Sequence, residues 1–257
     1  MFSWLVTGNC KVFNKMGYFK DQEGIMNRYI REVTNWKPHL ENTKLAILKS
    51  SAGKGRGKLA ILGSGWLLDV PIEELSARFD QVWLFDIKHP AQINRKVDRY
   101  KNVRLVETDI SGFAITIFNI SQNVKSEFDI DSLKPQFDFD LEGFDMVVSC
   151  NILNQLDIIL MDYLKKTKKV SSEIESQVRR LIQKSHINLL PESKSCLISD
   201  VEELSIDKEN QVVKRKSLVY ADKLSMDSGH TWIWQFDNCC SYNPIYNTWF
   251  KVIAADI

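Results

Sequence analysis

The sequence lacks long hydrophobic runs. No apolar stretch approaches the roughly 20 residues that a bilayer-spanning helix needs. The opening segment, MFSWLVTGNCKVF, is too short and too polar for a secretory signal peptide. We therefore expect a cytoplasmic protein with no membrane partner.

Excess charge of either sign is also missing. The 34 Lys and Arg residues nearly balance the 33 Asp and Glu residues, which leaves a net charge of +1. No global field therefore draws the chain to nucleic acid or anionic lipid, and nucleic acid is disfavoured as a partner. With 257 residues, 44% of them hydrophobic, the chain has ample material for a buried core. Nothing in the sequence predicts the oligomeric state.

Cysteines are few, and their spacing is not that of a metal site. The chain has five, an odd number, and none forms a C-x-x-C motif. Cys150 and Cys196 lie in strand-like apolar runs, where cysteine usually acts as a small hydrophobic residue. The four histidines share no metal-ligand spacing. We expect neither a disulfide framework nor a metal site.

From residue 59 onward, strand-like segments alternate with helix-like ones, which predicts a doubly wound α/β fold with a mostly parallel sheet. The last two strand-like segments predict a hairpin, with an antiparallel strand at the C-terminus. Two polar regions, 114–143 and 202–228, resemble irregular insertions. The predicted strands are 59–62, 82–85, 103–106, 144–150, 195–200, 231–236 and 249–256; the clearest predicted helices are 22–50, 71–79 and 171–190, the last with a capping box from Ser172 to Glu175.

The first 58 residues contain no strand signal. We therefore predict two parts: residues 1–58 form an N-terminal helical cap or lid, and residues 59–257 form the sheet domain. Four polar side chains in the cap are candidates to face a ligand: Gln22, Asn27, Arg28 and Arg31.

A glycine turn follows the first strand-like run, and polar residues follow the next three. Gly63 and Gly65 come directly after the first run, and Asp86, Asp109 and Asn151 follow the others. In an open α/β sheet, ligands bind at the carboxyl ends of the strands. Glycines allow close backbone approach, and a carboxylate after the second strand can accept hydrogen bonds from two ribose hydroxyls. The pattern predicts a nucleotide-like ligand, and a tight turn without a ligand is the alternative.

Residues just after the turn separate the possible ligands. A dinucleotide fingerprint would place glycine where Leu68 stands. Asp69, Glu73 and Glu74 put carboxylates near the start of the following helix, where a pyrophosphate would be repelled. S-adenosylmethionine has no phosphate and carries a cationic sulfonium. The carboxylates near this helix start therefore disfavour S-adenosylmethionine less than they disfavour a dinucleotide. A nicotinamide-dependent oxidoreductase remains an alternative.

Five segments occur in this order: LAILGSGWL, VWLFDI, VETDI, FDMVVSCNILNQL and CLISDVEE. In order and spacing they resemble the successive motifs of class I (Rossmann-like) S-adenosylmethionine-dependent methyltransferases, over about residues 59–257. The resemblance implies a seven-stranded sheet whose last strand is antiparallel, and S-adenosyl-L-methionine as cofactor. It also implies the cofactor-binding residues Gly63, Ser64, Gly65, Asp86, Asp109, Ile110, Asn151, Ile152 and Leu153.

The predicted function is therefore a transferase that moves a methyl group to a small-molecule acceptor. Because the sulfonium methyl is already activated, catalysis needs mainly alignment and desolvation, and we expect no catalytic triad. Asn151 and Gln155 are the candidates to orient the acceptor, whose identity the sequence does not reveal. Ile61 and Leu67 stand where the family usually has an acidic residue and a third glycine. A non-catalytic protein that binds S-adenosylmethionine is thus a second alternative.

Overall fold

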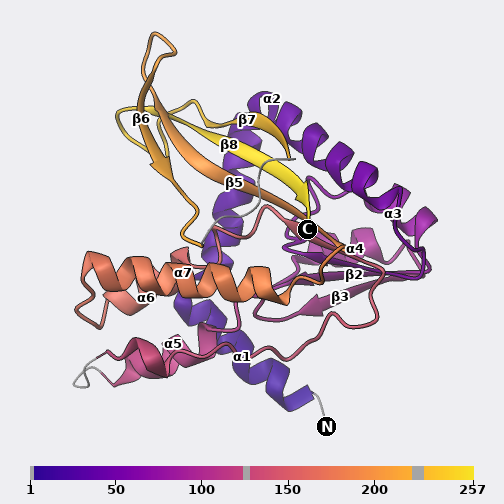
Figure 1. Cartoon of the computed structure of the whole chain (residues 1–257), viewed down its shortest axis with the longest axis horizontal. Helices are drawn as coiled ribbons and strands as arrows, with labels where there is room; N and C mark the ends of the chain where they lie inside the picture. Colours follow the sequence, from indigo (N-terminus) through magenta and orange to yellow (C-terminus); the bar gives the residue numbers. More distant parts are fainter. Residues whose placement is uncertain (1–2, 124–127, 222–228) are drawn as a thin grey trace.

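The computed structural model describes residues 3–123, 128–221 and 229–257. The chain folds into a sheet with helices on both faces (Figure 1). The helices are α1 (Ser3–Met16), α2 (Tyr18–Ser51), α3 (Ile72–Arg78), α4 (Ala91–Val97), α5 (Ala114–Gln122), α6 (Ile158–Lys165) and α7 (Ser172–Leu189), with a 3-10 turn at Ile130–Ser132. The strands are β1 (Lys58–Leu62), β2 (Gln81–Asp86), β3 (Val103–Glu107), β4 (Met146–Cys150), β5 (Ser195–Ile206), β6 (Val212–Ser217), β7 (His230–Asp237) and β8 (Asn247–Asp256).

The sheet confirms the predicted doubly wound, mostly parallel fold, but in the described residues it has eight strands rather than the predicted seven. Its strand order is β3-β2-β1-β4-β5-β8-β7, with β6 paired to the outer half of β5. Strands β1 to β5 are parallel to one another. The last strand, β8, lies antiparallel between β5 and β7, which confirms the predicted C-terminal hairpin. The order reverses between β1 and β4, and ligands bind at such a switch point.

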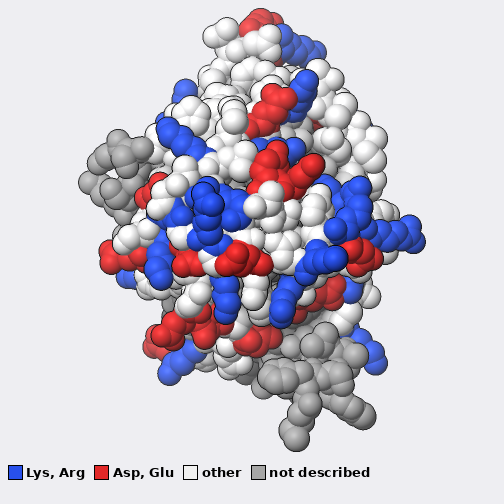
Figure 2. Space-filling model, turned by 90° about the vertical axis from the view of Figure 1, so that its right-hand side faces the viewer, with Lys and Arg blue, Asp and Glu red and all other residues white. Residues whose placement is uncertain are grey.

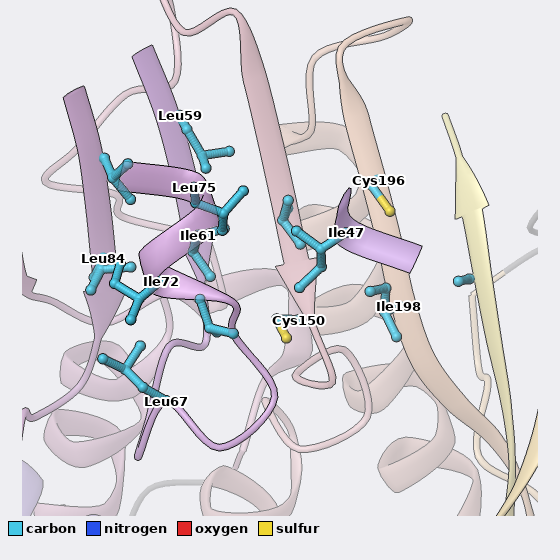
Figure 3. Close-up of a cluster of buried hydrophobic side chains, with 14 of the residues drawn as sticks. Ile47, Leu59, Ile61, Leu67, Ile72, Leu75, Leu84, Cys150, Cys196 and Ile198 are labelled. Carbon is cyan, nitrogen blue, oxygen red and sulfur yellow. The ribbon is translucent and has the colours of Figure 1, made fainter. Parts of the chain in front are cut away.

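Two hydrophobic clusters cover the two faces of the sheet. On one face, Ile72 and Leu75 of α3 pack near Ile61 of β1, and Ile47 of α2 packs near Ile198 of β5 (Figure 3). Cys150 and Cys196 belong to the same cluster, which confirms that they act as small hydrophobic residues. Helices α1, α5, α6 and α7 contribute to the cluster on the other face.

Helix α2 ties the N-terminus to the sheet. It is 34 residues long and follows α1 after a single residue, Gly17, whose φ of 106° suits glycine. The helix bends at Glu32, where φ and ψ leave the helical range and the carboxylate accepts the Asn238 N–H at 2.9 Å. Beyond the bend, Trp36 is 2% exposed and its Nε1 donates to the Phe236 carbonyl at 2.8 Å. The predicted boundary at residue 58 falls at the start of β1, and the division into two domains stays a prediction.

Three local predictions were wrong. The described part of region 202–228, up to residue 221, contains the end of β5 and all of β6, an exposed, basic edge strand whose sequence lacks the apolar alternation of a half-buried strand. Region 114–143 contains α5. This helix has no polar N-cap residue; instead, the N–H of its first residue, Ala114, donates to the carboxylate of Asp109. The cap of α7 is Ser171, not Ser172: the Ser171 Oγ accepts the Ile174 N–H at 3.2 Å.

None of the helices in the described ranges combines the length and apolarity of a bilayer-crossing segment. On the face shown in Figure 2, Lys and Arg side chains are mixed with Asp and Glu. This distribution agrees with the near-zero net charge of the chain.

Candidate functional site

A cavity of about 480 Å³ lies at the carboxyl ends of β1, β2, β3 and β4 and beside the middle of β5, and residues of α2 between Tyr18 and Leu40 form one of its walls. Except for Leu153, every predicted cofactor residue lines it. Leu153 is fully buried in the core on the other side and does not line the cavity. The lining residues from the prediction are Gly63, Ser64, Gly65, Asp86, Asp109, Ile110, Asn151 and Ile152, together with the acceptor candidate Gln155.

The glycine turn has two positions with different surroundings. Gly63 has φ 84°, and a Cβ there would lie 2.9 Å from both the Cys150 carbonyl oxygen and the Ile152 Cβ. Gly65 has φ 42°, and a Cβ there would meet only the Asp86 Oδ2, at 3.8 Å. Gly63 therefore serves the close packing of β1 against the loop after β4. Gly65 leaves room for a ligand beside the carboxylate of Asp86.

Asp86 ends β2 and holds the glycine turn. Its Oδ2 accepts the Gly65 N–H at 2.7 Å, and its Oδ1 accepts the Ile87 N–H at 2.8 Å. Burial is the main cause that raises the pKa of Asp86 to about 6, against these stabilising bonds. The carboxylate is thus oriented before any ligand arrives, with lone pairs left for further donors.

Gln22 of α2 reaches the same carboxylate. Its Nε2 donates to the Lys88 carbonyl at 2.7 Å and lies 3.4 Å from the Asp86 Oδ1. The Gln22 carbonyl accepts the Trp66 indole N–H at 2.8 Å. Of the other cap residues, Arg28 lines the cavity, whereas Asn27 and Arg31 do not. Helix α2 therefore contacts the glycine turn through Gln22.

Asp109 lies at the next strand end, but most of its lone pairs are used. Its Oδ1 accepts from both the backbone N–H and the Oγ of Ser111, and its Oδ2 accepts the Ala114 N–H at 2.7 Å. A carboxylate has about four acceptor sites, so Oδ2 keeps one for a ligand. Ile110 supplies an apolar surface beside it, 3% exposed.

Asn151 lines the cavity and has a left-handed conformation, with φ 51°. Its Nδ2 donates to the Asp69 Oδ2 at 2.7 Å, and its carbonyl accepts the Gln155 amide at 2.6 Å. Among the described residues, its buried Oδ1 has no hydrogen-bond partner. Gln155 thus holds the Asn151 loop, and Asn151 keeps a free acceptor toward the cavity.

Nearby, the ring of His39 is a neutral part of the wall. The Trp232 indole N–H donates to the His39 Nδ1 at 3.1 Å, which places the ring proton on Nε2. Burial lowers the pKa of His39 to about 3, so the ring stays uncharged. It stacks on Trp234, with ring centroids 3.9 Å apart. This histidine serves packing, a role that its spacing in the sequence does not reveal.

Asn154 is a cavity residue that the sequence reasoning missed. Its Nδ2 donates to the Asp200 Oδ2 at 2.6 Å, and both side chains line the cavity. Burial raises the pKa of Asp200 to about 6. Asp200 and Glu203 lie within β5 and line the cavity, whereas Glu202 binds Arg215 on the outside. The repeat of Asn in NILNQ was the available signal for Asn154.

No family model matches the chain, and no curated protein matches its sequence. Among solved structures it is similar to the DhpI-SAM-HEP complex, at 11% identity and a TM-score of 0.41, over 93% of this chain and 96% of that chain. It is also similar to a Burkholderia thailandensis 1,6-didemethyltoxoflavin-N1-methyltransferase with bound 1,6-didemethyltoxoflavin and S-adenosylhomocysteine, at 11% identity and a TM-score of 0.38, over 93% and 90% of the two chains. A SAM dependent methyltransferase from Aquifex aeolicus follows, at 11% identity and a TM-score of 0.35, over 84% and 89%. Because these scores are low, the function proposed below rests on the cavity itself.

Proposed function

We propose that the protein is a class I S-adenosylmethionine-dependent methyltransferase acting on a small molecule. The observation that carries this proposal is the open space at Gly65, bordered by the carboxylate of Asp86. A nucleoside fits there with its ribose hydroxyls donating to Asp86. The strand order, with an antiparallel last strand, supports the same assignment.

The residues present fit S-adenosylmethionine. Asp86 would accept from the ribose, Asp109 and Ile110 would border the adenine, and Asn151 and Ile152 would border the methyl end. When bound, this cofactor would supply a methyl group on its sulfonium sulfur, which a lone pair of the acceptor would take while sulfur keeps the electron pair of the broken S–C bond and the acceptor gives up its proton. The chain contributes alignment and exclusion of water.

The same geometry disfavours a dinucleotide. The helix that should receive a pyrophosphate, α3, begins only at Ile72, so its N-terminus does not adjoin the Gly63–Gly65 turn. It also carries Glu73 and Glu74 in its first turn. A pyrophosphate would meet carboxylates where it needs free N–H groups.

Calorimetric titration with S-adenosylmethionine, S-adenosylhomocysteine and NAD⁺ tests the proposal. We expect the first two to bind and NAD⁺ not to bind. Tighter binding of NAD⁺ would favour the oxidoreductase. Binding of S-adenosylhomocysteine without methyl transfer to any of a broad panel of small molecules would favour a non-catalytic binding protein.

Gln22→Ala should weaken binding of S-adenosylhomocysteine by about 2- to 10-fold, because a long hydrogen bond to the Asp86 carboxylate and the bond to the adjacent Lys88 carbonyl are lost. Calorimetry measures the change, and Asn27→Ala on the exposed side of α2 is the matched control. Equal affinity in the two variants would mean that α2 does not act as a lid over the cofactor. Deleting residues 1–40 is a poorer test, since it also removes Trp36 and His39 from the core.

Binding of S-adenosylhomocysteine should depend on pH through Asp86. Burial raises the pKa of this carboxyl to about 6 in the free protein, whereas two donating hydroxyls favour its charged form and lower the pKa in the complex. Affinity should therefore be constant above about pH 7 and fall up to about tenfold per unit as the pH drops below 6. The neighbouring charge, Glu107, is bonded to Lys88 at 2.8 Å. The Asp86→Asn variant should lack this dependence; an unchanged pH profile in that variant would assign it to another group.

A further inference from the structure

One part of the cavity lining contains none of the predicted cofactor residues. We call it the acceptor end. It lies on the face of the sheet covered by α2, where β5, β7 and β8 run side by side. Its lining residues are Asn154, Asp200, Trp234, Phe236, Tyr242 and Phe250.

Asn154 and Asp200 form a buried pair with spare acceptors. They are 7% and 3% exposed, and the bond between them uses the Asn154 Nδ2 and the Asp200 Oδ2. Within the described ranges, the other oxygen of each side chain has no hydrogen-bond partner. Buried polar atoms are normally paired, so two adjacent unpaired acceptors indicate a ligand that brings N–H or O–H donors.

Aromatic rings make the wall beside this pair. The centroids of Trp234 and Phe236 are 4.9 Å apart, and those of Phe236 and Phe250 are 4.7 Å apart. The guanidinium of Arg28, a planar cation, already lies 4.6 Å from the Phe236 centroid. A wall of this kind favours flat, electron-poor or cationic groups.

We propose that the methyl acceptor is a planar aromatic molecule bearing N–H groups, which donate to Asp200 and Asn154 while its ring lies against Trp234 and Phe236. The proposal rests on the proposed function, because it concerns the second substrate of the same cavity. It names the class of substrate and leaves the methylated atom unassigned.

The charges at this end support a donor rather than an anion. Glu203 lines the cavity and stands opposite Lys216 in the β5–β6 ladder, so opposite charges lie on neighbouring strands. Arg28 faces the ring wall, and Asp200 remains as the buried charge next to the spare oxygens. A carboxylate placed beside Asp200 would be repelled by its charge. A group rich in hydrogen-bond donors would not be repelled.

Three probes of one shape test this substrate class: benzamidine, benzamide and benzoate, each titrated into the full-length protein with and without saturating S-adenosylhomocysteine. We expect benzamidine to bind tightest and benzoate weakest. Asp200→Asn should weaken benzamidine about tenfold or more, because a charge-assisted hydrogen bond is lost. Glu202→Gln, which loses the same charge on the neighbouring exposed face, should bind benzamidine as the wild type does.

Benzoate binding as tightly as benzamidine, equal benzamidine affinity in wild type and Asp200→Asn, or no binding of any probe at millimolar concentration would each overturn the proposal. If Asp200→Asn does not fold, Asn154→Ala replaces it, with the same expected loss of benzamidine affinity. Binding of S-adenosylhomocysteine, measured on the same samples, separates the two claims. If it binds and the probes fail, only the substrate class is wrong; if it does not bind, the proposed function fails.

Discussion

Replacing Asp86 with asparagine should weaken binding of S-adenosylhomocysteine about 30- to 1000-fold, equivalent to roughly 2–4 kcal/mol. Two ribose hydroxyls donating to a carboxylate form charge-assisted hydrogen bonds. The side chain of asparagine is neutral and has only one acceptor oxygen, so it cannot form both bonds. The side chain of Asp86 also accepts the Gly65 N–H, so the amide would loosen the turn against which the nucleoside lies. Calorimetry on the two proteins measures the loss.

Asp80→Asn is the matched control for this variant. Asp80 is exposed and lies just before the opposite end of β2, so the change removes the same charge far from the cavity. Its affinity should equal that of the wild type. An Asp86→Asn variant that binds as tightly as the control would show that Asp86 is not the ribose partner.

Alanine at Gly63 should mainly lower stability, whereas alanine at Gly65 should mainly weaken ligand binding. At Gly63, the positive φ and a Cβ 2.9 Å from the Cys150 carbonyl oxygen should cost about 2–4 kcal/mol of unfolding free energy. At Gly65, the positive φ alone should cost about 1–2 kcal/mol, because the nearest atom to the Cβ is 3.8 Å away. Binding of S-adenosylhomocysteine should nevertheless fall at least about tenfold in Gly65→Ala, since the methyl group occupies space that the ligand needs.

Urea unfolding and calorimetry, run on both variants, separate the two roles. A Gly65→Ala protein that loses stability as much as Gly63→Ala, yet binds the ligand normally, would mean that Gly65 serves only the fold.

Much of the cavity could be predicted because its residues directly follow strands. Periodicity locates the ends of β1, β2 and β4, and parallel strands bring those ends together, so Gly65, Asp86 and Asn151 line one cavity. Whether adjacent residues of a loop face the cavity or the core depends on its turns. Ile152 lines the cavity while Leu153 is buried in the core, a distinction that their similar side chains do not reveal.

Contacts between residues far apart in the chain could not be predicted from the sequence. The bond between Asn154 and Asp200 joins residues 46 apart, and Gln22 reaches Asp86 across 64 positions. No periodic pattern in the sequence indicates either contact. Strand β6 was missed for a different reason: all of its residues are exposed, so no apolar alternation marks it.

The proposed function requires that the nucleoside of S-adenosylmethionine lies between Gly65 and Asp86. A crystal structure of the protein with S-adenosylhomocysteine tests it most directly. We predict both ribose hydroxyls within hydrogen-bond distance of the Asp86 carboxylate, the ribose against the Gly65 backbone and the adenine beside Ile110. A ligand bound elsewhere, or one whose ribose does not reach Asp86, would contradict the claim.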